Sequence, residues 1–205
     1  MCNSLYENDF IEKKSVKQIS SQIIIIDCGS SKVQDIQRCL EELNAETEVF
    51  KWNELPKNIS SAKGIVISGN PTLITLNDPQ PYLTHLAFLT EFEQPILGIC
   101  FGHQIIGMLH GATVTMGQES RGVESLKIVS SSSLFNDLKD DIVMGQDHCE
   151  EINLPKDFKL IASSQTCEVE AMQHKFKPIF GVQFHPEVSG VQGLVLLKNF
   201  VKTCN

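Results

Sequence analysis

The sequence lacks any apolar run close to the roughly 20 residues that a membrane-spanning helix needs. It also lacks an apolar segment near Met1, because residues 1–20 carry Glu7, Asp9 and Glu12, which is not typical of a secretory signal. Basic residues are not in excess: 17 Lys and Arg stand against 25 Asp and Glu, for a net charge of −8. We therefore expect neither membrane association nor a broad surface for nucleic acid.

Paired cysteines and nucleotide-binding glycine motifs are also missing. No Cys-x-x-Cys pair and no His/Cys/Asp/Glu cluster with metal-ligand spacing occurs, so the sequence predicts neither a zinc site nor a disulfide framework. No Gly-x-Gly-x-x-Gly or Walker pattern occurs either, so no nucleotide cofactor is expected on this chain by those means. Seven scattered cysteines fit a reducing compartment, and we expect a cytoplasmic protein.

What is present is the pattern of one α/β domain. Residues 1–21 are polar and of mixed charge and predict a flexible N-terminal arm, while residues 22–205 predict a single domain. Up to residue 110, predicted strands alternate with predicted helices, which favours a doubly wound, mostly parallel sheet. Beyond residue 112, short strands and turns predict a mixed or antiparallel C-terminal extension. The expected strands are 22–27, 48–50, 64–67, 95–99, 112–115, 125–129, 142–144, 160–163, 168–172 and 178–182, and the expected helices are 30–43, 82–92, 103–110 and 191–201.

The most informative segment lies at residues 95–104, which read P-I-L-G-I-C-F-G-H-Q. An apolar strand passes through Gly98 and Gly102, with Cys100 between them, directly into a helix, and this is the pattern of a nucleophile elbow with cysteine in the serine position. The helix N-terminus that follows favours a thiolate and can stabilise an oxyanion. The alternative interpretation is a cysteine that is merely buried between sheet and helix.

A second motif, at residues 181–187, supplies what a thiol nucleophile needs. It reads G-V-Q-F-H-P-E and places His185 at the end of a predicted strand, with Glu187 two positions further on. Because residues two apart in an extended segment point to one side, Glu187 can accept a hydrogen bond from His185. A base oriented by a carboxylate activates a nucleophile in this way, so we expect Cys100, His185 and Glu187 to form a catalytic triad.

Together, G-I-C-F-G-H-Q at 98–104 and Q-F-H-P-E at 183–187 resemble the motifs of the class I, triad-type glutamine amidotransferases. The resemblance runs from about residue 23 to residue 201. Within that family the chain is most similar to the glutaminase domain or subunit of GMP synthetase, through residues 25–30, 64–69, 147–155 and 162–171. The resemblance implies hydrolysis of L-glutamine to glutamate and ammonia through a cysteine thioester.

The same resemblance implies an oxyanion hole formed by the backbone N–H groups of Asn70 and Phe101. Residues 68–71 read S-G-N-P, which on their own residue types are also a plain turn. The family usually has Gly-Gly-Pro where this chain has Gly69-Asn70-Pro71. Because a backbone donor survives that change, the Asn70 side chain is expected to be dispensable.

Substrate-binding residues are implied in two further places. Gln104 lies one helical turn beyond Cys100 and matches a glutamine that holds the amino-acid end of the substrate, although it also fits a surface amide. Residues 146–150 resemble a loop whose backbone meets the α-amino and α-carboxyl groups of glutamine. The expected contacts there are Asp147, His148, Cys149 and Glu150, where the subfamily commonly has His-Gly-Asp or His-Lys-Asp.

The chain contains no synthetase sequence, so the resemblance implies that ammonia passes to a separate chain. The expected partner is an ATP-pyrophosphatase synthetase that aminates XMP to GMP, with ATP and Mg²⁺ bound to that partner. Two alternatives stay open at this point: a stand-alone γ-glutamyl peptidase or hydrolase with the same triad, and a regulatory subunit with impaired catalysis.

Overall fold

The run of four isoleucines at residues 23–26 forms β1 (Ile23–Asp27), a strand buried on both faces inside an eight-stranded sheet. The computed structural model describes residues 22–138 and 141–205, so the expected N-terminal arm at 1–21 lies outside the described residues. The order of strands is β2-β1-β3-β4-β10-β9-β8-β6. The remaining strands of this sheet are β2 (Thr47–Lys51), β3 (Gly64–Ile67), β4 (Ile96–Ile99), β6 (Lys127–Ile128), β8 (Phe158–Ser163), β9 (Ala171–His174) and β10 (Ile179–Val182).

The sheet changes direction at β10. From β2 to β10 neighbouring strands run parallel, whereas β9, β8 and β6 each pair antiparallel with their neighbour. This confirms the expected doubly wound, mostly parallel sheet with an antiparallel extension. Parallel strands place their carboxyl ends on one edge, and that edge is where α/β proteins carry their sites.

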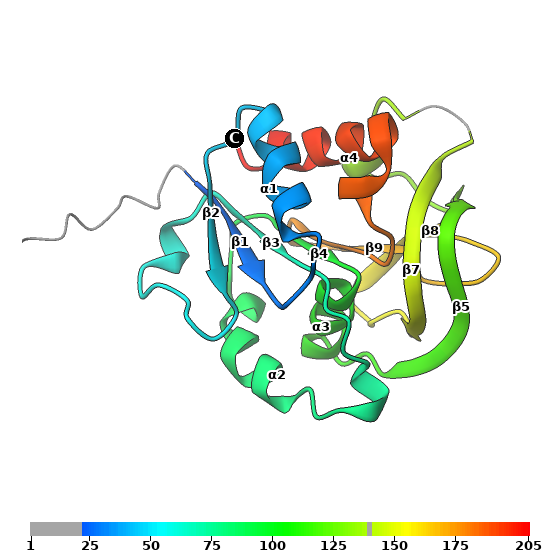
Figure 1. Cartoon of the computed structure of the whole chain (residues 1–205), viewed down its shortest axis with the longest axis horizontal. Helices are drawn as coiled ribbons and strands as arrows, with labels where there is room; N and C mark the ends of the chain where they lie inside the picture. The colour runs from blue at the N-terminus through cyan, green and yellow to red at the C-terminus, as the bar shows by residue number, and fades with distance from the viewer. Residues whose placement is uncertain (1–21, 139–140) are drawn as a thin grey trace, which may run out of the picture.

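Helices cover both faces of the sheet (Figure 1). One face carries α1 (Val33–Glu42) and α4 (Gly190–Thr203), and the other carries α2 (Gln80–Leu86) and α3 (Phe101–Leu109). Two apolar clusters fill the space between the layers, one around Ile36, Leu40 and Phe200 and the other around Ile65 and Ile105. No helix among the residues that the structure describes is long and apolar enough to cross a membrane.

Two helices are shorter than their patterns predict. The expected helix 30–43 begins only at Val33, because Ser30 Oγ accepts a hydrogen bond from the Lys32 N–H at 3.1 Å and holds a turn before the helix. The expected helix 82–92 is α2, which ends at Leu86 and continues as a 3₁₀ turn over Ala87–Thr90.

A separate two-stranded ribbon stands beside the sheet and differs most from the sequence prediction. It pairs β5 (Val114–Ser125) with β7 (Val143–Ile152), where only 112–115 and 142–144 were expected as strands. Most of β5 is exposed and rich in polar residues, so it has no apolar alternation to reveal it. Antiparallel pairing with a strand some thirty residues away makes it a strand. Residues 146–150 consequently belong to a strand and not to the expected loop.

Candidate active site

The candidate site lies where three parallel strands end side by side. Cys100 follows β4 directly, the segment with Asn70 follows β3, and His185 follows β10, and these strands are neighbours in the order β3-β4-β10. The topology therefore brings together residues that are up to 115 positions apart in the chain. Strand β7 closes the site from the other side, where the His185 N–H donates to the Gly145 carbonyl at 2.8 Å.

Cys100 has the strained backbone that its place between strand and helix predicts. Its φ is +52°, an unfavourable value for any residue with a Cβ, and it immediately precedes α3. A Cβ at Gly98 would lie 2.5 Å from the Gly102 carbonyl oxygen, and one at Gly102 would overlap the carbonyl oxygen of Ile67. Both glycines are therefore required for strand and helix to pass at this distance, which confirms the predicted elbow.

His185 and Glu187 form a buried pair. The His185 Nδ1 lies 2.7 Å from Glu187 Oε1, with side chains 5% and 1% exposed, so water screens this interaction little. The two side chains do not meet through the extended segment that the sequence predicted. Residues Pro186–Val188 form a 3₁₀ turn, and this turn folds the Glu187 carboxylate back toward the His185 ring. Burial alone lowers the pKa of His185, but hydrogen bonds to Cys100 and Glu187 outweigh burial and raise its pKa to about 10.

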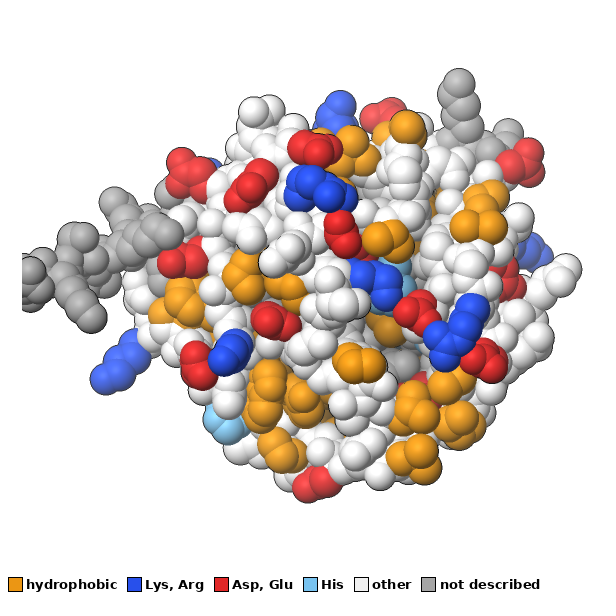
Figure 2. All heavy atoms as spheres, in the orientation of Figure 1, with side chains coloured by type: hydrophobic (Ala, Val, Ile, Leu, Met, Phe, Trp, Pro, Cys, Tyr) orange, Lys and Arg blue, Asp and Glu red, His pale blue; other side chains and the backbone are white. Residues whose placement is uncertain are grey.

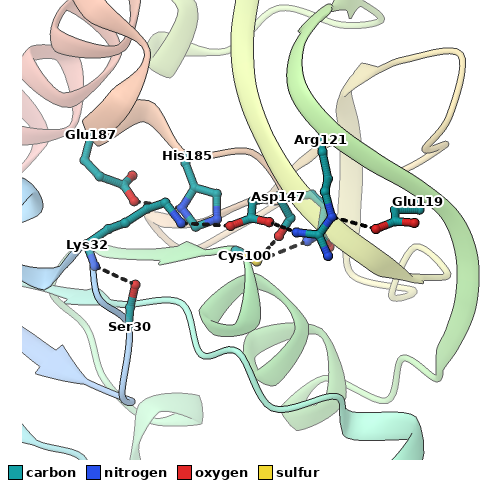
Figure 3. Close-up of polar contacts among 9 residues, drawn as sticks. Ser30, Lys32, Cys100, Glu119, Arg121, Asp147, His185 and Glu187 are labelled. Atoms are coloured by element: carbon teal, nitrogen blue, oxygen red, sulfur yellow. Dashed lines mark hydrogen bonds and ion pairs between the residues drawn. The ribbon is translucent and has the colours of Figure 1, made fainter.

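The thiol of Cys100 points toward this pair and toward β7 (Figure 3). Its Sγ lies 4.0 Å from the Asp147 carbonyl oxygen and 3.6 Å from Gln183 Nε2. Gly69 lies next to both Cys100 and His185, because a Cβ at this position would be 3.3 Å from His185 Cε1 and 3.7 Å from the Cys100 Cβ. The hydrogen bonds of His185 to Cys100 and to Glu187 place the three residues expected to form a triad next to one another.

A cavity of about 300 Å³ opens in front of the thiol, large enough for an amino acid. It is lined by eight of the residues singled out in the sequence and by several that were not. The expected lining residues are Asn70, Cys100, Gln104, Asp147, His148, Cys149, Glu150 and His185. The additional ones that bear on the chemistry are Ser30, Lys32 and Arg121. Within residues 22–138 and 141–205, no group of three or more His, Cys, Asp or Glu could hold a metal ion.

Two backbone N–H groups are available next to the thiol. Phe101 is the first residue of α3, where a backbone N–H has no partner inside the helix. Asn70 lies in the segment that follows β3, the strand next to β4. Among the described residues, neither N–H donates a hydrogen bond. The positive end of α3 adds to the Phe101 donor, so this corner of the site can hold a negatively charged oxygen.

The side chain of Asn70 is more engaged than the sequence predicts. Its Nδ2 donates to the Cys28 carbonyl and, at 2.9 Å, to the Tyr82 hydroxyl, while its Oδ1 accepts from the Thr72 N–H at 2.6 Å. These bonds tie the segment after β3 to the end of β1 and to α2. The Asn70 side chain therefore helps to fix the conformation of this segment, which the sequence did not indicate, while its expected dispensability for activity stays a prediction.

On the β7 side, the expected substrate contacts divide between the two faces of the strand. His148 and Glu150 are buried, whereas Asp147 and Cys149 are more exposed. The carboxylate of Glu150 accepts from the N–H groups of Ile74 at 3.0 Å and Thr75 at 2.7 Å, so it holds the segment after β3 in place. That carboxylate is therefore committed to the protein, and the Glu150 carbonyl accepts from Gln104 Nε2 at 3.4 Å.

Charged side chains alternate across the mouth of the cavity. Asp147 accepts from Lys32 Nζ at 3.0 Å and is also paired with Arg121, which in turn contacts Glu119 at 2.6 Å (Figure 3). The hydrogen bond from Lys32 lowers the pKa of Asp147. Figure 2 shows Lys and Arg side chains next to Asp and Glu side chains over the region between α1 and β5. The sequence patterns did not indicate Lys32 and Arg121. The β5–β7 pairing places Arg121 opposite Asp147, and the turn before α1 brings Lys32 to the same carboxylate from the other side of the chain fold.

The fold and this site define a class of protein, and comparison with known families agrees. The sequence profile of the family described as glutamine amidotransferase class-I matches residues 24–204. The chain therefore belongs to the class-I glutamine amidotransferase family.

Its relatives include the A subunit of glutamine-hydrolyzing GMP synthase from Pyrococcus furiosus, which is 39% identical over 89% of this chain and 98% of the relative. The protein of the same name from Methanocaldococcus jannaschii is 34% identical over 89% of this chain and 97% of the relative. A crystal structure assigned to the A subunit of the Thermoplasma acidophilum GMP synthase superposes with a TM-score of 0.82, at 32% identity, over 89% of this chain and 93% of that one.

Proposed function

We propose that this chain is the glutaminase subunit of a two-chain GMP synthetase. The observation that carries the proposal is the strained Cys100 beside the buried His185–Glu187 pair, at a cavity of amino-acid size, in a class-I glutamine amidotransferase. The relatives from Pyrococcus and Methanocaldococcus, each named as one subunit of a glutamine-hydrolyzing GMP synthase, support the pathway.

In the proposed reaction, the Cys100 thiolate adds to the side-chain amide carbon of L-glutamine. The C=O electron pair moves to oxygen, where the N–H groups of Asn70 and Phe101 stabilise the negative charge. The His185 imidazolium gives its proton to the departing nitrogen, and ammonia leaves a γ-glutamyl thioester. His185 then takes a proton from water, the hydroxide adds to the thioester, and the C–S bond breaks to release glutamate. Glu187 keeps His185 oriented and supports its charged form.

Recognition of the substrate in this proposal uses the rest of the cavity wall. The α-amino and α-carboxyl groups of glutamine lie against Gln104 and the β7 backbone at His148 to Glu150. Asp147 and Cys149 lie at the mouth of the cavity, and Gly69, which has no side chain, leaves room beside Cys100 and His185. Cys149 stands where the subfamily commonly has Gly or Lys, and its strand position keeps the backbone extended along the cavity.

Ammonia then passes to a separate synthetase chain, an ATP-pyrophosphatase that aminates XMP, and ATP and Mg²⁺ bind to that chain. The described cysteines are free thiols, which fits a reducing cytoplasm. Free-running hydrolysis would waste glutamine, so the isolated chain is expected to work slowly and to be accelerated by its partner through a population shift at the segment of residues 68–72.

The test is glutamate release by the purified chain, measured alone and then with a recombinant XMP-aminating synthetase, XMP and ATP. We expect at least a tenfold increase in rate, with Cys100→Ser inactive under both conditions. A parallel assay with γ-glutamyl dipeptides separates the alternatives. Full activity without any synthetase and a preference for dipeptides would support a stand-alone γ-glutamyl hydrolase, and no glutamate under any condition would support a regulatory subunit.

A further inference from the structure

A third polar group contacts the nucleophile besides His185 and the backbone. Gln183 follows β10, two positions before His185, and is fully buried. Its Nε2 lies 3.6 Å from Cys100 Sγ, within reach of a hydrogen bond to sulfur. The Gln183 backbone is also held, because its N–H donates to the Glu170 carbonyl at 2.8 Å. Such a buried amide next to the reacting atom has no part in the triad mechanism described above.

The contacts of Gln183 permit only one orientation of its amide group. Gln104 Nε2 donates to the Glu150 carbonyl at 3.4 Å, and a backbone carbonyl can only accept. The same Nε2 lies 3.3 Å from Gln183 Oε1, so the carbonyl end of Gln183 must face Gln104. The NH₂ end of Gln183 must then face the sulfur. Gln104 thus donates in two directions, to the Glu150 carbonyl on strand β7 and to Gln183, and Gln183 in turn donates to the sulfur.

We propose that Gln183 is a hydrogen-bond donor to the Cys100 thiolate, and that Gln104 is a positioning residue that orients it through the backbone of Glu150. A thiolate accepts this bond strongly, whereas a neutral thioester sulfur accepts it weakly. The contact therefore favours ionisation of the thiol before attack and favours the thiolate as leaving group when the thioester is hydrolysed. Unlike His185, Gln183 keeps its protons throughout the cycle, so it supports both steps in the same way.

This arrangement also links the nucleophile to the substrate. Gln104 lines the cavity and lies between Gln183 and the β7 backbone. Substrate glutamine that binds against Gln104 therefore holds the side chains of Gln104 and Gln183 in place. Removal of the Gln183 donor should therefore reduce kcat with little change in KM, because Gln183 is buried behind the thiol and does not line the cavity. This inference rests on Cys100 being the nucleophile of the proposed function.

The test is the pH dependence of Cys100 alkylation by iodoacetamide, followed by mass spectrometry of the peptide that contains Cys100, in the full chain. Gln183→Met keeps the length of the side chain and removes the donor. We expect the midpoint of the alkylation profile to rise by about one pH unit, the scale of one hydrogen bond to a charged group, and kcat for glutamine to fall at least tenfold. The charged and titratable groups that line the cavity, and the carboxylate paired with His185, stay unchanged in this variant: His185, Glu187, Asp147, His148, Cys149, Glu150, Lys32 and Arg121.

Gln183→Glu serves as a second variant, because it is isosteric and places an acceptor beside the sulfur. It should raise the midpoint further, and a circular dichroism melt shows whether each variant is folded. Gln173→Met, at a part-buried glutamine on β9, is the matched control and should leave midpoint and kcat unchanged. An unchanged midpoint in both folded Gln183 variants would overturn the inference. Because alkylation needs no substrate, a shifted midpoint without glutaminase activity would count against the proposed function alone.

Discussion

At the scale of single residues, Cys100 is set apart from the other described cysteines by its surroundings. Burial raises the pKa of the Cys28 and Cys167 thiols far above the usual range and raises that of Cys204 to about 12, so these side chains stay neutral. Cys149 lines the same cavity as Cys100, but burial also raises its pKa, and no imidazole contact favours its thiolate. Reactivity toward glutamine analogues should therefore distinguish Cys100 from Cys149, although both line the same cavity.

We predict that an electrophilic glutamine analogue labels Cys100 with a stoichiometry of one and that Cys100→Ser abolishes both labelling and glutaminase activity. Mass spectrometry of the peptide that contains residues 98–104 is the measurement. Cys149→Ser is the control, because it lines the same cavity, and it should keep labelling and most activity. An adduct at Cys149 with Cys100 unmodified would contradict the assignment.

At the scale of structural elements, the segment after β3 depends on side chains from three other elements. Asn70 bonds to the end of β1 and to α2, and the Glu150 carboxylate from β7 accepts from the next turn at Ile74 and Thr75. The candidate oxyanion donor at Asn70 is thus positioned by its own side chain and by β7. A glycine at position 70 would keep the donor but lose its anchor.

We predict that Asn70→Gly folds but is destabilised by about 1–2 kcal/mol, because it loses side-chain hydrogen bonds and gains backbone freedom. Its kcat should fall about tenfold, because a smaller fraction of molecules has the backbone N–H of residue 70 in place. This loss is smaller than the roughly hundredfold or greater loss that removal of an oxyanion donor itself causes. Urea unfolding and steady-state glutaminase assays are the measurements.

Asn77→Gly is the control for that variant, because Asn77 lies in the same segment and its Nδ2 donates one exposed bond, to the Leu73 carbonyl. It should change kcat little. Wild-type stability and kcat in Asn70→Gly would show that the side-chain bonds of Asn70 do not hold the segment.

At the scale of the whole molecule, one buried carboxyl group couples stability to pH. Glu170 is fully buried, and burial raises its pKa to about 7, although a hydrogen bond from Gln146 at 2.9 Å opposes this. The unfolded chain releases this proton near pH 4.5 and the folded chain near pH 7, so the folded state binds more protons between these values. The contribution of Glu170 to stability therefore declines as pH rises from 4.5 to 7.

We predict that Glu170→Gln stabilises the fold by about 2 kcal/mol at pH 8, because it removes the cost of a buried charge and can still accept from Gln146. The gain should shrink toward zero near pH 4.5. Thermal melts at a series of pH values measure it, with the exposed Glu168→Gln as control. A gain of equal size at pH 4.5 and pH 8 would contradict a titrating Glu170.

Much of the architecture could be predicted because its signals are local. The isoleucine run of β1, the strand-to-helix transition around Cys100 and its two flanking glycines each lie within a few residues, and so does the His185–Glu187 spacing. Those patterns predicted the sheet type, the elbow and the closeness of His185 to Glu187. The structure contains the predicted sheet, the strained backbone at Cys100 and the His185–Glu187 pair. The catalytic roles of these residues stay predictions, to be tested by the variants above.

The sequence by itself therefore determined the family, the sheet type and the strand-to-helix elbow at Cys100, because hydrophobic periodicity, turn residues and motif spacing are properties of short segments. Only the tertiary structure decided the β5–β7 ribbon, the Lys32–Asp147–Arg121 contacts, the anchoring by Glu150 and the link from Gln183 to the thiol. The side-chain contacts among these join residues between 26 and 115 positions apart. No short segment encodes them, because each side chain acquires its partner only when the strands pair and their ends meet.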